Sequence, residues 1–131
     1  MLERIKRLEE NIVELLRLRE RFEVDGILAD KHAEWALRYG YLETIQVLID
    51  ISCHLVSKYN LGNPATYADC IKLLAKHGYL DEGLTIKLIG MVGLRNILIH
   101  QYQEVGVERL YQLLSSTDDI RLFVQQIGGL L

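Results

Sequence analysis

The sequence predicts an all-α protein, a compact antiparallel bundle of about five helices. Apolar residues recur every three or four positions along nearly the whole chain, which is the spacing of amphipathic helices. No segment shows the alternation of a half-buried strand, and there is no internal repeat. With 131 residues, of which 50% are hydrophobic and 25% charged, the chain can bury one core, so we expect a single domain over residues 1–131.

The first two helices are predicted from apolar spacing and from the breaks beside them. A first helix is expected up to about residue 22, because its apolar residues step by three and four. These residues are Leu2, Ile5, Leu8, Ile12 and Leu15. The pair Asp25-Gly26 is expected to break the chain. A second helix should begin within residues 26–31, with Asp25 or Asp30 as its N-cap, and should end before residues 60–64.

Two further helices have recognisable caps. Thr66 and Asp69 have the spacing of a capping box and should open a third helix that ends at Gly78. Asp81 can cap a fourth helix that ends within residues 101–105.

A fifth helix is expected after Gly106, because its apolar residues again share one face. Residues 115–118 are polar and can interrupt it, and Gly128-Gly129 should fray its end.

The composition is typical of a cytoplasmic protein. No apolar run approaches ~18 residues, and charged residues alternate with Leu and Ile at the N-terminus, so neither a membrane span nor a signal peptide is expected. Cys53 and Cys70 are too few and too scattered for a disulfide framework, which favours a reducing compartment. A net charge of −3 argues against a protein that coats nucleic acid. The four His residues lack metal-ligand spacing, so no metal site is expected.

The most informative segment is Gly93-Leu94-Arg95-Asn96-Ile97-Leu98-Ile99-His100-Gln101-Tyr102. It places Arg, Asn, His and Tyr among apolar neighbours, where polar side chains are costly. Arg can hold a phosphate in a bidentate fork, and His can move protons near neutral pH. Asn96 and His100 are one turn apart, so the amide is expected to orient the imidazole. Arg95 lies on the adjoining face, which indicates a site that either needs Arg95 to reach across or forms between two protomers.

A structural explanation of the same residues is a buried polar cluster that ties this helix to its neighbours, since Arg-x4-His alone is a weak pattern. Gly90 and Gly93, one turn apart, would suit close approach of another backbone, such as that of a dimer partner.

Other polar and aromatic residues are expected to have structural roles. His54 should be a hydrogen-bonded core or interface residue, with Asp50 as its partner or merely exposed. Arg38 and the lysines should form a solvated surface, and Trp35 and the seven Tyr should be core and interface residues.

The segment Gly93-Leu94-Arg95-Asn96 followed by His100-Gln101-Tyr102 resembles the signature of the HepT-type toxins of the HEPN superfamily. The resemblance extends over nearly the whole chain. It includes Ile49-Asp50-Ile51 with His54, the segment from Tyr67 to Gly78 and the closing amphipathic helix. It implies an HEPN-like helical fold and a homodimer in which both motifs line a shared cleft.

The resemblance also implies a function, namely the toxin of a type VII-like toxin–antitoxin system that acts as a metal-independent endoribonuclease without a cofactor. Arg95 would stabilise the phosphate, His100 would transfer protons, and Asn96 would orient the site. Tyr102 would accept AMP from a cognate minimal nucleotidyltransferase antitoxin, which silences the toxin. RNA would be the substrate, and no DNA or membrane contact is expected.

Two hypotheses of other classes stay open at this point. The chain could be a non-catalytic subunit that presents a nucleotide or protein segment to a nucleotidyltransferase, with Arg95 and His100 only binding. It could also be a plain helical dimerisation module, which leaves the polar cluster unexplained.

Overall fold

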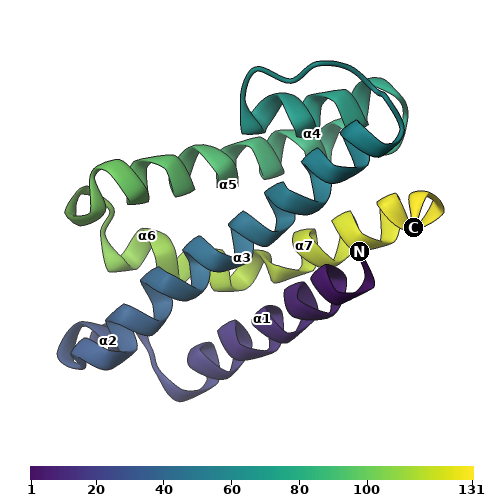
Figure 1. Cartoon of the computed structure of the whole chain (residues 1–131). Coiled ribbons are helices and arrows are strands. Elements are labelled where there is room, and N and C mark those ends of the chain that lie inside the picture. Colours follow the sequence, from purple (N-terminus) through teal and green to yellow (C-terminus); the bar gives the residue numbers. More distant parts are fainter.

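The computed structural model describes residues 1–131, and every regular element in it is a helix (Figure 1). The α-helices are α1 (Leu2–Arg21), α2 (Val24–Ala29), α3 (Lys31–Lys58), α4 (Tyr67–Lys76), α5 (Glu82–His100), α6 (Val107–Gln112) and α7 (Thr117–Gln126). Short 3₁₀ turns are η1 (Tyr102–Glu104), η2 (Leu113–Ser116) and η3 (Ile127–Leu130). The predicted all-α bundle is confirmed.

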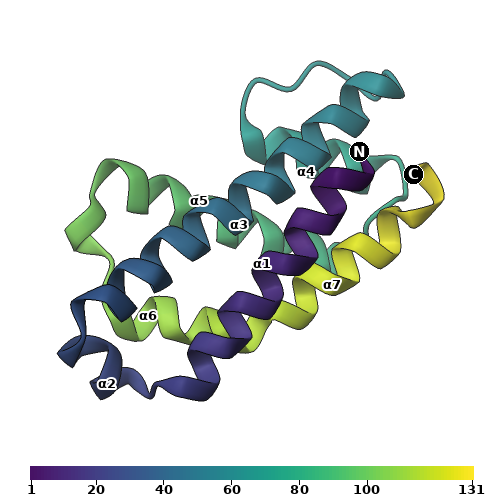
Figure 2. The same ribbon diagram turned by 60° about the horizontal axis from the view of Figure 1, so that its bottom comes forward.

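Helix α3 runs through the middle of the bundle. It contacts α1 on one side and α4 and α5 on the other (Figure 1). Helix α7 lies beside α1, and the two chain termini lie at the same end of the molecule (Figure 2). Gly40 lets α1 approach α3 closely, since a Cβ there would lie 3.2 Å from the Leu15 side chain.

The core is formed by apolar side chains from all the long helices. Residues with no solvent exposure include Leu8, Ile12, Leu37, Ile45, Ile71, Leu74, Leu88 and Phe123. Burying each such side chain contributes about 1.5–3 kcal/mol. Helix α5 is long and apolar enough to cross a membrane by length and composition alone. Core helices meet the same criterion, and α5 contacts α3, α4 and α7.

Three helix starts follow the predicted caps. The Asp30 carboxylate accepts hydrogen bonds from two backbone N–H groups at the start of α3. Thr66 and Asp69 form a complete capping box at α4. Asp81 accepts a hydrogen bond of 2.7 Å from the backbone N–H of Leu84 in α5. Such backbone donors favour the ionised carboxylate, and they lower the pKa values of Asp69 and Asp81 below the ordinary value.

The predicted break at Asp25-Gly26 is wrong, because these residues lie inside α2. The chain instead turns at Phe22, whose backbone is extended. The Tyr111 hydroxyl donates a hydrogen bond of 2.8 Å to the Phe22 carbonyl oxygen, and the Phe22 ring packs against Gly26. The position of the turn at Phe22 therefore depends on a long-range contact with Tyr111. The residues next to Phe22 in the sequence could not indicate that contact.

The fifth helix is interrupted as predicted, but the interruption begins two residues before the predicted residues 115–118. The segment after Gly106 is divided into α6, η2 and α7, and the short turn η2 covers Leu113–Ser116. Thr117 at the start of α7 is buried although its neighbour Asp118 is exposed. The end of the chain is the 3₁₀ turn η3, which includes Gly128 and Gly129.

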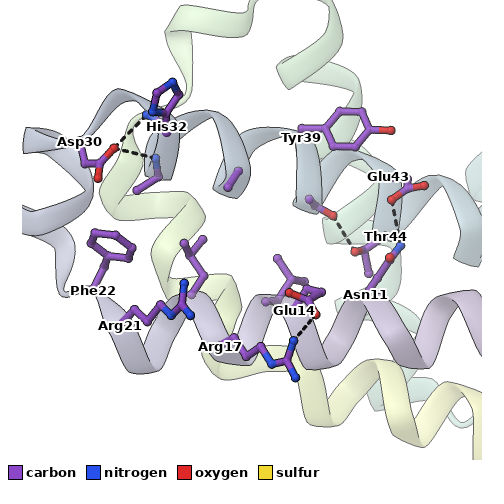
Figure 3. A pocket seen from close by; sticks show the side chains of 15 residues that line it. Asn11, Glu14, Arg17, Arg21, Phe22, Asp30, His32, Tyr39, Glu43 and Thr44 are labelled. Atoms are coloured by element: carbon purple, nitrogen blue, oxygen red, sulfur yellow. Dashed lines mark hydrogen bonds and ion pairs between the residues drawn. The ribbon is translucent and has the colours of Figure 1, made fainter.

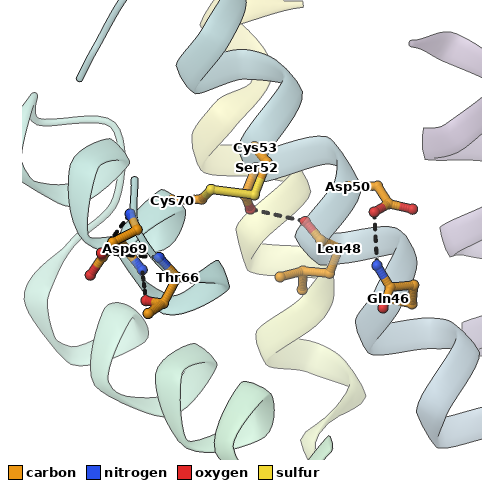
Figure 4. The surroundings of a disulfide bond; sticks show 9 residues. Gln46, Leu48, Asp50, Ser52, Cys53, Thr66, Asp69 and Cys70 are labelled. Atoms are coloured by element: carbon orange, nitrogen blue, oxygen red, sulfur yellow. Dashed lines mark hydrogen bonds between the residues drawn. A yellow bond between two sulfur atoms is a disulfide. The ribbon is translucent and has the colours of Figure 1, made fainter. Parts of the chain in front are cut away.

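The number and spacing of the cysteines did not lead us to expect a disulfide, yet the structure contains one. Cys53 of α3 and Cys70 of α4 form a disulfide, with their Cα atoms 5.1 Å apart (Figure 4). The capping box starts α4 directly after the turn that follows α3, so α4 packs back against α3. Two residues that are 17 positions apart thereby become neighbours. Cysteine spacing alone carries no signal for such a pairing.

Candidate functional site

The four residues of the predicted motif lie at the C-terminal end of α5 and in the turn beyond it. Arg95 and Asn96 are half-buried in α5, and His100 is its exposed last residue. Tyr102 is 45% exposed and begins η1. The chain leaves helical geometry at Gln101, so Tyr102 does not continue a face of α5.

Arg95 is held by contacts from three helices. Its Nη1 donates a hydrogen bond of 2.9 Å to Asn96 Oδ1, and its Nη2 donates to Gln46 Oε1 of α3. The guanidinium carbon lies 5.2 Å from the centroid of the Tyr67 ring of α4. Gln46 is fixed in turn by a hydrogen bond of 2.9 Å to Asp50 Oδ1. The guanidinium plane therefore has a defined position, which suits the binding of a planar or tetrahedral anion.

One nitrogen of the Arg95 guanidinium has no hydrogen-bond partner. Its Nε is buried and has no hydrogen-bond acceptor within the chain. A buried donor without an acceptor costs about 1–3 kcal/mol, so such an atom calls for an explanation.

The predicted contact between Asn96 and His100 is wrong. Asn96 uses its amide oxygen for Arg95, and the imidazole of His100 makes no hydrogen bond within the chain. Arg95 competes for the amide because it lies beside Asn96 and carries the stronger, charged donor. Asn96 thus positions Arg95, whereas His100 is free in solvent.

Arg38 is a site residue that the sequence analysis missed. It is only 6% exposed, so its assignment to a solvated surface is wrong. Its Nη1 donates to the carbonyl oxygens of Val105 at 2.7 Å and Tyr102 at 3.1 Å, and its guanidinium carbon lies 4.9 Å from the Tyr102 ring centroid. Its Nε pairs with Glu34. The i,i+4 spacing of Glu34 and Arg38 was the available signal for an ordered Arg.

A cavity of about 410 Å³ is bordered by Tyr67 and Asn96, which both contact Arg95. Its lining residues are Cys53, Pro64, Ala65, Thr66, Tyr67, Cys70 and Asn96. The disulfide therefore forms part of its wall, and the capping-box residue Thr66 forms another part (Figure 4). Asn96 connects this cavity with Arg95.

A larger cavity of about 710 Å³ lies between α1 and α3 (Figure 3). Its charged residues are mostly paired, as in the ion pair between Arg17 and Glu14 at 2.8 Å. None of the motif residues lines it. We therefore place the candidate site at the end of α5 and not in the larger cavity. No group of three or more His, Cys, Asp and Glu side chains gathers in the structure.

The exposure of His54 and Trp35 corrects two other expectations. His54 is exposed and makes no hydrogen bond, and Asp50 pairs with Gln46 and not with His54. A core role for His54 is therefore wrong. Trp35 is 52% exposed, with Lys31 and His32 as its ring contacts, so it is not a core residue either.

Residues 2–127 match the model of the family described as Ribonuclease HepT-like. The chain is 32% identical to the mRNA nuclease HepT of Shewanella oneidensis over 83 residues, which are 63% of this chain and 62% of that protein. It is 30% identical to the tRNA nuclease HepT of Aphanizomenon flos-aquae over 87 residues, which are 66% and 59% of the two chains. The matched segments thus span about three-fifths of the length of these relatives.

The fold has a solved counterpart. A structure of the tri-AMPylated Shewanella oneidensis HEPN toxin in complex with MNT antitoxin superimposes with a TM-score of 0.88 at 23% identity, covering 98% of this chain and 96% of that one. At this identity the likeness shows a shared fold. The family match covers the motif and nearly all of the bundle, and the chain therefore belongs to the HepT-like ribonuclease family.

Proposed function

We propose that this protein is the toxin of a toxin–antitoxin pair and acts as an endoribonuclease without a metal or organic cofactor. The observation that carries the proposal is the guanidinium of Arg95, which is held by Gln46, Asn96 and Tyr67 while Nη1 and Nη2 each keep a second N–H. An immobilised donor fork is suited to a phosphodiester. The family name and two curated nuclease relatives support the assignment to RNA.

The proposed reaction is an internal transfer on RNA. The ribose 2′-oxygen attacks the adjacent phosphorus, a new P–O2′ bond forms, and the P–O5′ bond breaks. One base removes the 2′-hydroxyl proton and one acid delivers a proton to the leaving 5′-oxygen, which leaves a 2′,3′-cyclic phosphate and a 5′-hydroxyl end. Arg95 stabilises the charge that develops on the phosphoryl oxygens. His100, with an exposed and unpaired imidazole, serves as acid or base.

The second proton-transfer group comes from a second copy of the chain in a homodimer. On α5, the residues Ile86, Gly90, Gly93, Ile97 and His100 follow one another at spacings of three and four and are all exposed. Ile86 is 65% exposed, and nothing lies within 4 Å of a Cβ built at Gly90 or Gly93. A two-fold contact along this face would bury the apolar stripe and bring both His100 side chains to one cleft.

Tyr102 is the proposed acceptor of AMP from a minimal nucleotidyltransferase antitoxin. Its ring is 45% exposed and lies over Arg38, within the turn that follows His100. Adenylylation would add a bulky group and about one negative charge next to the site. The solved relative is tri-AMPylated and bound to its MNT antitoxin, which supports this regulation. We propose that the pair acts in the cytoplasm, because its proposed reactants are RNA and ATP.

An RNA-cleavage assay in the presence of a chelator tests the activity. We expect cleavage with cyclic-phosphate ends by the purified protein, and no cleavage by Arg95→Ala or His100→Ala. Folded protein that binds RNA but never cleaves it would favour the non-catalytic binding subunit. Sedimentation at micromolar concentration tests the dimer, and a monomer would contradict the shared cleft.

The regulation is tested separately by intact-mass spectrometry after incubation with the nucleotidyltransferase and ATP. We expect AMP addition to the wild type and loss of that addition in Tyr102→Phe. Equal addition to both proteins would show that Tyr102 is not the acceptor.

A further inference from the structure

The cavity beside Arg95 has the composition of a site for a flat, partly polar ring. Its volume of about 410 Å³ falls within the ~300–1,000 Å³ typical of small-molecule sites. Its walls are the Cys53–Cys70 disulfide, the Pro64–Thr66 segment and the Tyr67 ring, and Asn96 supplies an amide. Most of these groups are apolar or aromatic. The polar side chains are the Asn96 amide and the Thr66 hydroxyl, whose oxygen already accepts a hydrogen bond from the Asp69 backbone N–H.

The walls of this cavity are fixed before any ligand binds. The disulfide joins α3 to α4, and Asp69 holds the backbone N–H groups of both Ala65 and Thr66 at 3.0 and 3.2 Å. Tyr67 and Cys70 are three residues apart in α4, so they lie on the same face of that helix. A preformed cavity binds without a large ordering cost.

Tyr67 offers the surface on which a ring can stack. Arg95 lies over its ring, yet the residue remains 45% exposed, and the hydroxyl makes no hydrogen bond in the chain. Every nucleobase has a π-face that stacks on an exposed aromatic side chain. Tyr67 therefore brings a stacking surface into contact with the proposed phosphate-binding Arg.

Asn96 offers a hydrogen-bond donor of known orientation. A guanidinium can only donate, so the Asn96 atom that faces Arg95 has to be the amide oxygen. The amide nitrogen Nδ2 then faces away from Arg95 and donates to no group of the chain. A donor in this place selects a ligand edge that carries an acceptor, such as a ring nitrogen or a carbonyl of a base.

We propose that this cavity binds a nucleobase of the RNA next to the phosphate held by Arg95, with the base stacked on Tyr67 and read by Asn96 Nδ2. The inference rests on the proposed ribonuclease function and adds a subsite that recognises the base. Phosphate and base would be bound by adjacent groups of one network, since Asn96 and Tyr67 both contact Arg95. If so, the protein should prefer RNA that carries a particular base next to the phosphodiester bond that it cleaves.

The test compares nucleoside 5′-monophosphates (AMP, CMP, GMP and UMP) with ribose 5-phosphate, which lacks only the base. Binding is followed by NMR on the full-length protein, with the Asn96 side-chain amide signal as reporter. We expect at least one nucleotide to bind more tightly than ribose 5-phosphate and to shift the Asn96 signal. Equal affinities in the wild type would overturn the proposal.

Variants separate stacking from the support that Tyr67 gives Arg95. In Tyr67→Leu we expect the affinity of the preferred nucleotide relative to that of ribose 5-phosphate to fall about 5- to 150-fold, as for the loss of one base–aromatic stack. Tyr67→Phe should retain the preference. A fall of both affinities by the same factor would mean that Tyr67 acts only through Arg95, and would overturn the base site. Tyr39→Leu is the matched control, because Tyr39 is also exposed and lines the separate cavity.

Cleavage of RNAs with each base at the target position provides the second readout. We expect wild type to prefer the base that binds best as a monophosphate, and Tyr67→Leu to lose this preference. Cleavage without any base preference would refute the subsite and leave the ribonuclease intact. If the protein binds the nucleotide but cleaves no RNA, the proposed ribonuclease function is refuted and the proposed base-binding cavity is retained.

Discussion

The guanidinium of Arg38 lies 4.9 Å from the ring centroid of Tyr102 and also donates a hydrogen bond of 3.1 Å to the Tyr102 carbonyl oxygen. Together with its bond to Val105, this contact fixes the turn after α5 on α3, 64 residues away in the chain. The Tyr102 side chain, the proposed AMP acceptor, therefore packs on the buried guanidinium of Arg38. The turn has few other interactions, since Tyr102, Gln103 and Glu104 are all exposed.

Replacement of Arg38 by Met should therefore loosen this turn. Two carbonyl oxygens and Glu34 lose their donor, and each buried polar group left without a partner costs about 1–3 kcal/mol. The carbonyl oxygen of Tyr102 can rebind water, so we expect the free energy of unfolding to fall by about 2–4 kcal/mol in urea denaturation. Arg17→Met is the control, because Arg17 is exposed, and it should change stability by less than about 0.5 kcal/mol.

Substitution of the two proposed catalytic residues should separate chemistry from stability. His100→Ala should lower the cleavage rate about 10²–10⁴-fold and leave the unfolding free energy nearly unchanged, because His100 is exposed and unbonded. Arg95→Ala should also abolish cleavage, but it removes the contacts to Gln46 and Tyr67 and should cost about 1–2 kcal/mol of stability. Undiminished cleavage by folded His100→Ala would contradict the proposed reaction.

Gln46 should act on the reaction through Arg95. In Gln46→Leu the guanidinium loses an acceptor on α3, so Arg95 becomes less ordered, and we expect the cleavage rate to fall about tenfold. Gln46→Glu keeps an acceptor and should retain more activity, although its charge next to Asp50 weakens phosphate binding and raises KM. Steady-state kinetics check both effects. A rate in Gln46→Leu equal to wild type would show that Asn96 and Tyr67 suffice to hold Arg95.

Much of the fold could be predicted because its signals are local. The caps at Asp30, Thr66 and Asp81 each lie within three residues of the N–H groups that they bind, so the sequence indicates them directly. The motif likewise indicated Arg95 and Asn96 as polar residues that need an explanation, with a buried polar cluster as the structural alternative. The partners of that cluster could not be predicted, because Gln46 is 49 residues from Arg95 and meets it only through the packing of α5 on α3.

The burial of Arg38 and the pairing of Cys53 with Cys70 could not be predicted for the same reason. A lone Arg in a helix is usually solvated, and only the return of the chain at residues 102–105 buries this one. Both cysteines lie in helices, and their approach depends on how α4 folds back along α3.

Removal of the disulfide should destabilise the α3–α4 pair. The bond closes a loop between residues 17 apart, for which the chain-entropy model gives about 3 kcal/mol. We expect the double variant Cys53→Ser/Cys70→Ser to lose about that amount in urea denaturation under oxidising conditions. Under a strong reductant, wild type and variant should have nearly equal stability. A difference that persists after reduction would mean that the two side chains contribute by packing and not by the bond.

Acid should weaken the start of α4 before it weakens the rest of the bundle. The Asp69 carboxylate accepts bonds from the N–H groups of Ala65 and Thr66, which lower its pKa below the ordinary 3.8. Because the folded pKa is the lower one, the stabilisation is fully present above 3.8 and is lost as the pH falls through the folded pKa. The stability difference between wild type and Asp69→Asn should thus be constant above about pH 5 and shrink at lower pH. Urea denaturation across this range checks it, and a difference that grows toward low pH would contradict the role of the ionised carboxylate.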